Sequence, residues 1–118
     1  MGKLYLTTTI PYVNAAPHIG HALEFVQADV IARSRRAAGD TVYFLSGADE
    51  NAMKNVQAAE QAGVPVEEFV AKNSQTFKDL LAALGVSNDQ FIRTTEERHK
   101  RGVQALWKAT KPEDIYRK

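Results

Sequence analysis

The sequence predicts an α/β fold in which three parallel strands with flanking helices form the first half of a doubly wound sheet. Short β-prone runs alternate with longer stretches of helical periodicity, in the order strand, helix, strand, two helices, strand, helix. Glycines follow the helical stretches at positions where helices commonly end. Each connection is long enough to hold a helix, and right-handed crossovers of this kind make the strands parallel, in the expected order third, second, first.

The first strand is expected over residues 4–10, buried on both faces if the sheet is parallel. A helix from about His18 to Ala38 follows, and Gly39 stands where that helix should stop. Apolar residues in this stretch recur at i, i+3, i+7 and i+8, which places them on one helical face. The residues expected to face the core are Leu23, Val26, Val30 and Ile31.

The second strand is expected over residues 41–45, where β-branched and aromatic residues dominate. A short helix should run from about residue 49 to residue 62 and close at Gly63. A longer helix over residues 65–84 should end at Gly85. The apolar stripe expected on the longer helix consists of Phe69, Phe77, Leu80, Leu81 and Leu84.

A short third strand is expected around residues 91–93. The pattern Thr94-x-x-Glu97 after it is typical of a capping box, in which two side chains satisfy the first turn of a helix. It predicts a last helix, which Lys111-Pro112 should stop. The residues expected to point inward from this helix are Val103, Leu106 and Trp107. A structural role is the interpretation for His99 and Trp107.

The composition is that of an ordinary globular domain. Of 118 residues, 44% are hydrophobic and 25% are charged, and a net charge of +1 gives no electrostatic case for a dedicated nucleic-acid-binding module. The absence of cysteine excludes disulfides and thiolate metal sites. We recognise no secretion signal at the start and no apolar run near the roughly 18 residues that span a bilayer, so a cytoplasmic location without a membrane partner is expected.

The most informative segment is residues 11–21, at the junction between the first strand and the first helix. His18 and His21 flank Gly20 there. Backbone N–H groups at a helix N-terminus are unpaired and carry partial positive charge, so anions bind at such positions. Glycine lets a flat base approach the main chain, and Pro17 restricts the loop. The segment therefore predicts a triphosphate site, with the alternative that both histidines only satisfy local hydrogen bonds.

A second segment, residues 47–51, begins just past the second strand. In a doubly wound sheet the ligand lies in the crevice at the carboxyl ends of the strands, where the strand order reverses. Both segments are expected at that crevice. Asp49 is a candidate ligand-binding carboxylate there, and a plain helix cap is the alternative.

Three stretches together resemble one family. The run His18-Ile19-Gly20-His21 is similar to the HIGH signature of class I aminoacyl-tRNA synthetases, and the opening Pro11-Tyr12-x-Asn14 resembles the methionyl enzymes. Residues 44–50 and 91–100 are further matches, and the resemblance extends from residue 3 to about residue 117. One departure is Asn51-Ala52, where the family commonly has His-Gly.

The resemblance implies a Rossmann-like (HUP-type) fold, with residues 1–118 as the N-terminal half of the synthetase catalytic domain. It implies ATP-dependent activation of methionine to methionyl-adenylate and transfer to tRNA(Met) in the complete enzyme, with ATP and Mg²⁺ but no metal site within this chain. The connective insertion, the second half of the catalytic domain and the anticodon-binding domain would be absent. The isolated chain is therefore expected to be incomplete, weakly active or inactive, and to need the remaining half as a partner.

The resemblance also implies roles for individual residues. Those implied to bind ATP are Asn14, Pro17, His18, Gly20 and His21, of which His18 and His21 would be catalytic. Those implied to bind methionine are Ile10, mainly through its main chain, Tyr12 and Asp49. No role is assigned to Glu50 or Lys54, and for Glu24 orientations toward the site and toward solvent both stay open.

Two other functions remain as alternatives. One is a different His-x-Gly-His nucleotidyltransferase on the same half-fold, although such proteins lack the Pro11-Tyr12-x-Asn14 opening and the 91–100 stretch. The other is a non-catalytic, synthetase-like module that binds a nucleotide.

Overall fold

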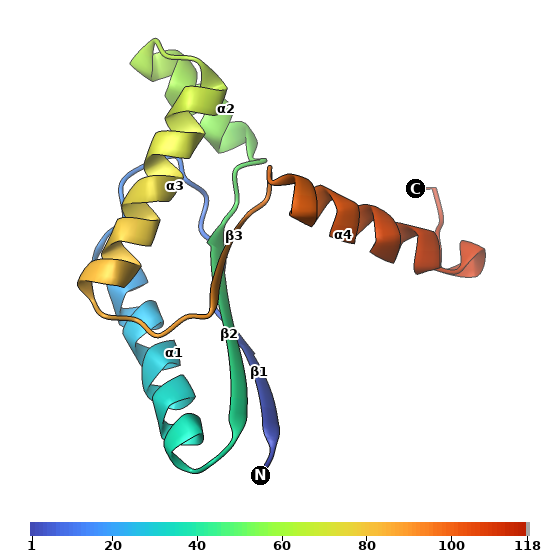
Figure 1. The fold of residues 1–118 in the computed structure, drawn as a ribbon. Helices are drawn as coiled ribbons and strands as arrows, with labels where there is room; N and C mark the ends of the chain where they lie inside the picture. The colour runs from blue at the N-terminus through green and yellow to red at the C-terminus, as the bar shows by residue number, and fades with distance from the viewer. Residues whose placement is uncertain (118) are drawn as a thin grey trace.

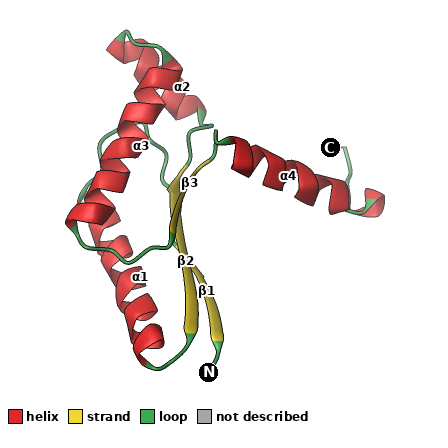
Figure 2. Ribbon diagram, viewed as in Figure 1, coloured by secondary structure: helices red, strands yellow, loops and turns green. Residues whose placement is uncertain are grey.

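The computed structural model describes residues 1–117, which form an open sheet with helices gathered mainly on one side (Figures 1 and 2). In chain order the elements are β1 (Lys3–Thr7), α1 (Ile19–Ala37), β2 (Thr41–Ala48), α2 (Met53–Ala62), α3 (Val66–Ala83), β3 (Gln90–Arg93), α4 (Glu97–Ala109) and a short 3₁₀ turn, η1 (Pro112–Asp114). The predicted alternation of strands and helices is confirmed.

The sheet is parallel, with β2 between β1 and β3. The predicted strand order and direction are therefore confirmed. Tyr5 of β1 pairs with Tyr43 of β2, and Ser46 of β2 pairs with Phe91 of β3. This register brings the carboxyl ends of all three strands to the same end of the sheet, where the loops that carry the candidate site begin.

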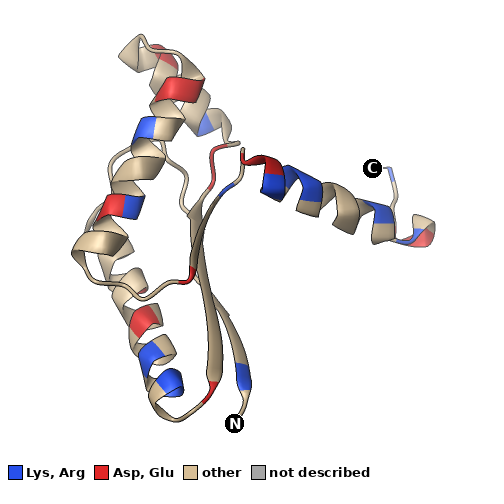
Figure 3. Cartoon of the chain, viewed as in Figure 1, with Lys and Arg blue, Asp and Glu red and all other residues tan. Residues whose placement is uncertain are grey.

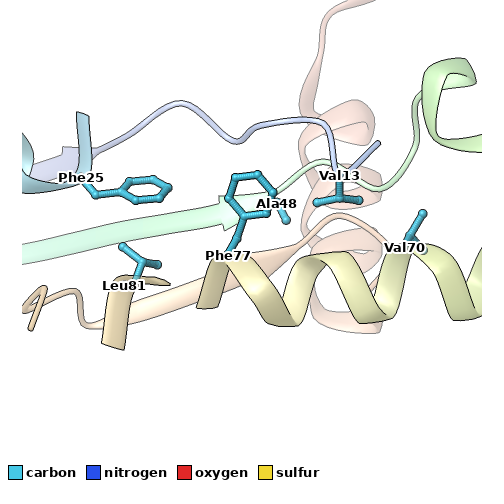
Figure 4. Packing of buried hydrophobic residues seen from close by; sticks show 6 residues of the cluster. All are labelled: Val13, Phe25, Ala48, Val70, Phe77 and Leu81. Carbon is cyan, nitrogen blue, oxygen red and sulfur yellow. The ribbon is translucent and has the colours of Figure 1, made fainter. Parts of the chain in front are cut away.

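The core lies between the sheet and the helices α1 and α3, which cover the same face (Figure 1). Figure 4 shows its larger cluster, in which side chains from the loop after β1, from α1, from β2 and from α3 meet. The members of that cluster are Val13, Phe25, Ala48, Val70, Phe77 and Leu81. A second cluster of Ala28, Ala32 and Phe44 lies between α1 and β2. Burial of these side chains supplies the main favourable term for folding.

The three predicted glycine stops are confirmed. Gly39, Gly63 and Gly85 follow α1, α2 and α3, with φ angles of +89°, +67° and +65°. Residues with a Cβ rarely adopt this left-handed conformation, so glycine at these positions ends each helix at low cost.

The predicted inward face of α1 is wrong. Leu23 and Val30 are 59% and 60% exposed, and Val26 and Ile31 are also exposed. The buried residues of α1 are instead Phe25, Ala28, Asp29 and Ala32. This helix carries apolar residues on two faces, and the face with two alanines can approach β2 more closely.

The predicted packing of α4 is also wrong. None of its described residues is buried, and Val103, Leu106 and Trp107 are all more than half exposed. Figure 1 shows α4 pointing away from the sheet, so the rest of the described chain offers no surface against its apolar side.

The predicted capping box at the start of α4 is absent. The residue that caps the helix is Glu96, and no side chain caps it by a hydrogen bond. The Thr94 hydroxyl instead contacts the segment after β2, where it accepts a hydrogen bond from the Glu50 N–H.

Several element boundaries differ from those predicted. β1 ends at Thr7 instead of residue 10, and its Tyr5 side chain is 64% exposed, because β1 is an edge strand with one open face. β2 continues to Ala48, and α2 begins at Met53 instead of near residue 49. On α3 the predicted stripe is largely confirmed: Phe77 and Leu81 are buried, Phe69 and Leu80 pack against the core, and Leu84 is exposed.

Acidic and basic residues are mixed over the helices and do not gather on one face (Figure 3). Within residues 1–117, no helix combines the length and apolar character that crossing a membrane requires.

Candidate active site

A cavity of about 600 Å³ opens where the loop after β1 meets the first turns of α1. Five of the predicted site residues line it, namely Tyr12, Asn14, His18, Gly20 and His21. Pro17 is half-buried in the same loop. The cavity therefore brings together most of the residues that the sequence singled out for nucleotide binding.

The two histidines cap α1 reciprocally. His18 is the N-cap, and its Nδ1 accepts a hydrogen bond from the Gly20 N–H at 3.0 Å. His21 Nδ1 accepts from the His18 N–H at 3.1 Å. Because Nδ1 is the acceptor in each ring, a neutral imidazole carries its proton on Nε2. Both histidines therefore do make the local hydrogen bonds that the sequence left open as the alternative to ligand binding. These bonds use only Nδ1, so each Nε2–H remains a potential donor to a ligand.

Stacking fixes the orientation of these rings. The centroids of His18 and His21 are 3.9 Å apart, and the edge of His21 meets the buried Phe77 ring at 5.0 Å. The pKa of His21 is lowered from its ordinary value, first by burial and then by the neighbouring His18, while Glu24 acts in the opposite direction. His21 is therefore predominantly neutral near pH 7 and acts as a hydrogen-bond donor more than as a cation.

Glycine at position 20 is required by the His18 ring. A Cβ added to Gly20 would lie 2.9 Å from His18 Cε1 and 3.0 Å from His18 Nδ1. With His18 in its capping position there is therefore no room for a side chain at position 20, which explains the glycine in the His-x-Gly-His turn.

Glu24 faces the site, which answers the orientation left open by the sequence. Its carboxylate accepts hydrogen bonds from the Thr9 N–H at 2.7 Å and from the Thr9 hydroxyl at 2.8 and 2.7 Å. Both residues line the cavity. This contact joins the loop that follows β1 to α1. Nothing in the sequence indicated a role for Thr9, because its partner is 15 residues away along the chain.

Asp49 lies beside Tyr12 at the end of β2. The two residues form an isolated parallel bridge, and the Asp49 N–H donates to the Pro11 carbonyl at 2.9 Å. The carboxylate Oδ1 of Asp49 accepts from the Asn51 N–H at 3.0 Å and from the Thr94 hydroxyl at 3.1 Å. Asp49 is not one of the described residues that line the cavity of His18 and His21, but it borders Tyr12, which does line it.

Ile10 is separated from this group. Its side chain lines a different cavity of about 500 Å³ on the open face of the sheet, together with Leu45 and Ile92. The structure therefore brings Tyr12 and Asp49 together but directs the Ile10 side chain elsewhere. A contribution of Ile10 to the site would have to come from its main chain.

The buried carboxylate of Glu50 forms an ion pair with Arg93, whose side chain is 37% exposed. The carboxylate has no exposed surface and lies 2.7 Å from Arg93 Nε, and it also accepts hydrogen bonds from Ser74 and Thr95. Burial alone would raise the pKa of Glu50, but the hydrogen bonds from these three residues and the charge of Arg93 bring it below its ordinary value. Glu50 thus anchors the segment after β2. Lys54, the other residue without an assigned role, is exposed on α2.

Asn51 stands where the resembling family commonly has histidine. Its side-chain Nδ2 donates to the Thr94 carbonyl at 3.4 Å, so the segment is still tied to the end of β3. Among the residues that the structure describes, no group of three or more His, Cys, Asp or Glu side chains could hold a metal ion.

The structure thus combines a three-stranded parallel sheet with a capped His-x-Gly-His turn at the carboxyl ends of the strands. Residues 4–118 match the family model described as tRNA synthetases class I (M). The chain therefore belongs to the class I tRNA synthetases.

Within that class the chain is similar to methionine–tRNA ligases. It is 44% identical to the methionine–tRNA ligase of Brucella suis over 98% of this chain and 50% identical to that of Rickettsia prowazekii over 88%. The chain spans only about a fifth of these relatives, 22% and 20% of their lengths.

A solved structure supports the same relation. A crystal structure of Mycobacterium tuberculosis methionyl-tRNA synthetase bound by methionyl-adenylate superposes with a TM-score of 0.86 at 46% sequence identity. The match covers 88% of this chain and 21% of that chain. The predicted α/β fold class, with three parallel strands and flanking helices, is thereby confirmed.

Proposed function

We propose that this chain supplies the N-terminal half of the catalytic domain of a methionine–tRNA ligase. In the complete enzyme, ATP would activate methionine to methionyl-adenylate, and the methionyl group would pass to tRNA(Met). The observation that carries the proposal is the pair of stacked, reciprocally capped imidazoles, His18 and His21, on a 600 Å³ cavity beside Tyr12 and Asp49. The names of the relatives and the adenylate in the solved neighbour support the substrates.

In this reaction a methionine carboxylate oxygen attacks the α-phosphorus of ATP, the bond to the bridging oxygen breaks, and pyrophosphate leaves. No enzyme nucleophile is needed, so catalysis consists of positioning and of stabilising developing charge. The Nε2–H groups of His18 and His21 would donate to phosphate oxygens. Asn14, Pro17 and Gly20 would shape the loop that admits the nucleotide.

The methionine would lie between the cavity and the end of β2. Tyr12 is 49% exposed and can offer its ring to the thioether, a contact that contributes about 0.3–1.5 kcal/mol. Two hydrogen-bond donors hold Asp49 Oδ1, and the carboxylate keeps acceptor capacity for the α-ammonium group. The main chain of Ile10 would complete this pocket.

The whole activity needs more than this chain. We propose that the remaining half of the catalytic domain and the tRNA-reading part of the protein are partners, since the chain spans about a fifth of its relatives. Mg²⁺ would accompany the phosphates of ATP. Proteins commonly bind this ion through one or two carboxylates together with the substrate's phosphates. A ligase that serves protein synthesis would act in the cytoplasm.

The proposal is tested by ATP–pyrophosphate exchange with methionine. The chain alone should exchange slowly or not at all, and adding the remainder of a related ligase in trans should restore exchange. His21→Ala should lower the restored rate by roughly a hundredfold, the usual cost of one lost transition-state donor. His99→Ala is the matched control, because His99 is on α4 and does not line the cavity of His18 and His21, and its rate should equal the parent's.

Two results would contradict the proposal. One is equal exchange by the parent and by His21→Ala after complementation. The other is a complemented chain that binds ATP but exchanges no pyrophosphate with any amino acid, which would instead favour the non-catalytic, nucleotide-binding alternative.

A further inference from the structure

Thr94, at the carboxyl end of β3, directs its polar atoms toward the segment after β2. Its hydroxyl accepts from the Glu50 N–H at 2.8 Å and lies 3.1 Å from Asp49 Oδ1. Its main-chain N–H donates to the Ala48 carbonyl at 3.2 Å, and its carbonyl accepts from the Asn51 side chain at 3.4 Å. The Thr94 residue is only 6% exposed, so these contacts are shielded from water.

The direction of the hydroxyl proton follows from these contacts. A threonine hydroxyl has one proton, and the Glu50 N–H already occupies one of its lone pairs. Asp49 Oδ1 can only accept, so the Thr94 proton must point at it. Oδ1 of the carboxylate is thereby held by the Thr94 hydroxyl and the Asn51 N–H, whereas Oδ2 accepts no hydrogen bond from the residues that the structure describes.

Hydrogen bonds to the buried Glu50 carboxylate keep Thr94 itself in place. The residues on either side of it, Arg93 and Thr95, both donate to the Glu50 carboxylate. Ser74 of α3 donates to the same carboxylate. The Asp49–Glu50 segment and the end of β3 therefore form one rigid unit that side-chain hydrogen bonds hold from three elements.

We infer that Thr94 is a positioning residue for Asp49, which it holds in the orientation that receives the α-ammonium group of methionine. The inference rests on the proposed function, because it takes the ligand of Asp49 from there. Thr94 touches neither reacting atom and acts only through the carboxylate.

The variant that tests this is Thr94→Val, which keeps the shape of the side chain and removes its hydroxyl. Methionine binding, measured by calorimetry on the chain complemented with the remainder of a related ligase, should weaken about tenfold or more, since the bond is to a charged group. ATP binding should stay at the parent's value, because the nucleotide contacts are at His18 and His21. Thr94→Ser restores the donor and should restore methionine binding.

A spectroscopic readout separates positioning from plain stabilisation. The ¹³C resonance of the Asp49 carboxyl, recorded on the chain alone, should shift in Thr94→Val and return in Thr94→Ser. Thr110→Val, at the exposed end of α4, is the matched control and should leave both the resonance and methionine binding unchanged. If Thr94→Val does not fold, Thr94→Cys keeps a side chain of similar size with a much weaker donor and takes its place.

The outcomes distinguish the two proposals. Parent-like methionine binding and an unshifted Asp49 resonance in folded Thr94→Val would overturn the positioning role. Weakened ATP binding to the same extent as methionine binding would also overturn it, because it would show general damage. A complemented parent that binds no methionine would overturn the proposed substrate, while the Asp49 resonance would still decide whether Thr94 holds the carboxylate.

Discussion

Replacing Gly20 by alanine tests directly whether the position of the His18 ring matters. The new Cβ would lie 2.9 Å from His18 Cε1 and 3.0 Å from His18 Nδ1. Because the nearest atoms belong to a side chain, the His18 ring can rotate away and the main chain need not move. That rotation breaks the bond from the Gly20 N–H to His18 Nδ1 and disturbs the stacking on His21.

The expected cost in stability is small. Loss of a side-chain N-cap costs about 1 kcal/mol. Alanine in place of glycine within a helix returns about 0.5–1 kcal/mol, and Gly20 lies inside α1. The two terms nearly cancel, so the free energy of unfolding should change little.

The expected cost in activity is large by comparison. A displaced His18 no longer presents its Nε2–H to the phosphates, and loss of one such donor costs about 3 kcal/mol, roughly a hundredfold in rate. Urea unfolding and ATP–pyrophosphate exchange after complementation measure the two effects on the same variant. Parent-like exchange by Gly20→Ala would refute the reasoning, because the ring position would then be unimportant.

The chain offers a matched control at Gly102. This residue is on α4, where an added Cβ would meet no atom within 4 Å. Gly102→Ala should raise the free energy of unfolding by about 0.5–1 kcal/mol through helix propensity and leave exchange unchanged.

Four further predictions concern contacts in and around the site. Gly47→Ala should unfold the domain or lower its free energy of unfolding by several kcal/mol, because the added Cβ would lie 2.3 Å from the main-chain carbonyl oxygen of Ile92. Urea titration measures this change, and a midpoint of unfolding equal to the parent's would contradict this packing. Arg93→Ala should lower the free energy of unfolding by about 3 kcal/mol or more at neutral pH, because it leaves the buried Glu50 carboxylate without its cation. The pKa of Glu50 is lower in the folded chain than in the unfolded chain, so the unfolded chain protonates Glu50 first as the pH falls. The stability that ionised Glu50 contributes is therefore complete above the ordinary pKa of 4.5 and is lost as the pH drops through the lower pKa of the folded chain. Glu50→Gln should flatten this part of the acid-unfolding profile, and an unaltered profile would show that Glu50 does not contribute. NMR titration of His21 should give a pKa below its ordinary value of 6.5, since burial disfavours the charged ring, and a value above it would mean that the Glu24 carboxylate dominates.

Local sequence signals predicted the elements well and their packing less well. The strands, the helices and the glycine stops depend on neighbouring residues, and all are present near their expected positions. The inward face of α1 could not be chosen from periodicity, because Leu23 and Phe25 belong to two apolar faces that are equally regular. The exposed side of α4 could not be foreseen either, because exposure depends on what lies opposite the helix.

In the site, too, local contacts were predicted and contacts between distant segments were not. His18, Gly20 and His21 are close in sequence, so their spacing alone predicted a shared turn, and the structure shows it closed by two hydrogen bonds. The orientation of Glu24 was left open and Thr94 was wrongly assigned to a helix cap, because their partners lie 15 and 45 residues away along the chain. Nothing in the local pattern distinguishes such side chains from ordinary surface or cap residues.

The alternation of elements, the ends of the helices and the imidazole turn could be derived from the order of the residues, because each arises from interactions over a few residues. The tie between Asp49 and Thr94, the burial of Glu50 against Arg93 and the position of Ile10 on the open side of the sheet could not be derived in this way. These arrangements depend on how parallel strands align and on which atoms are removed from water, and both are properties of the assembled sheet.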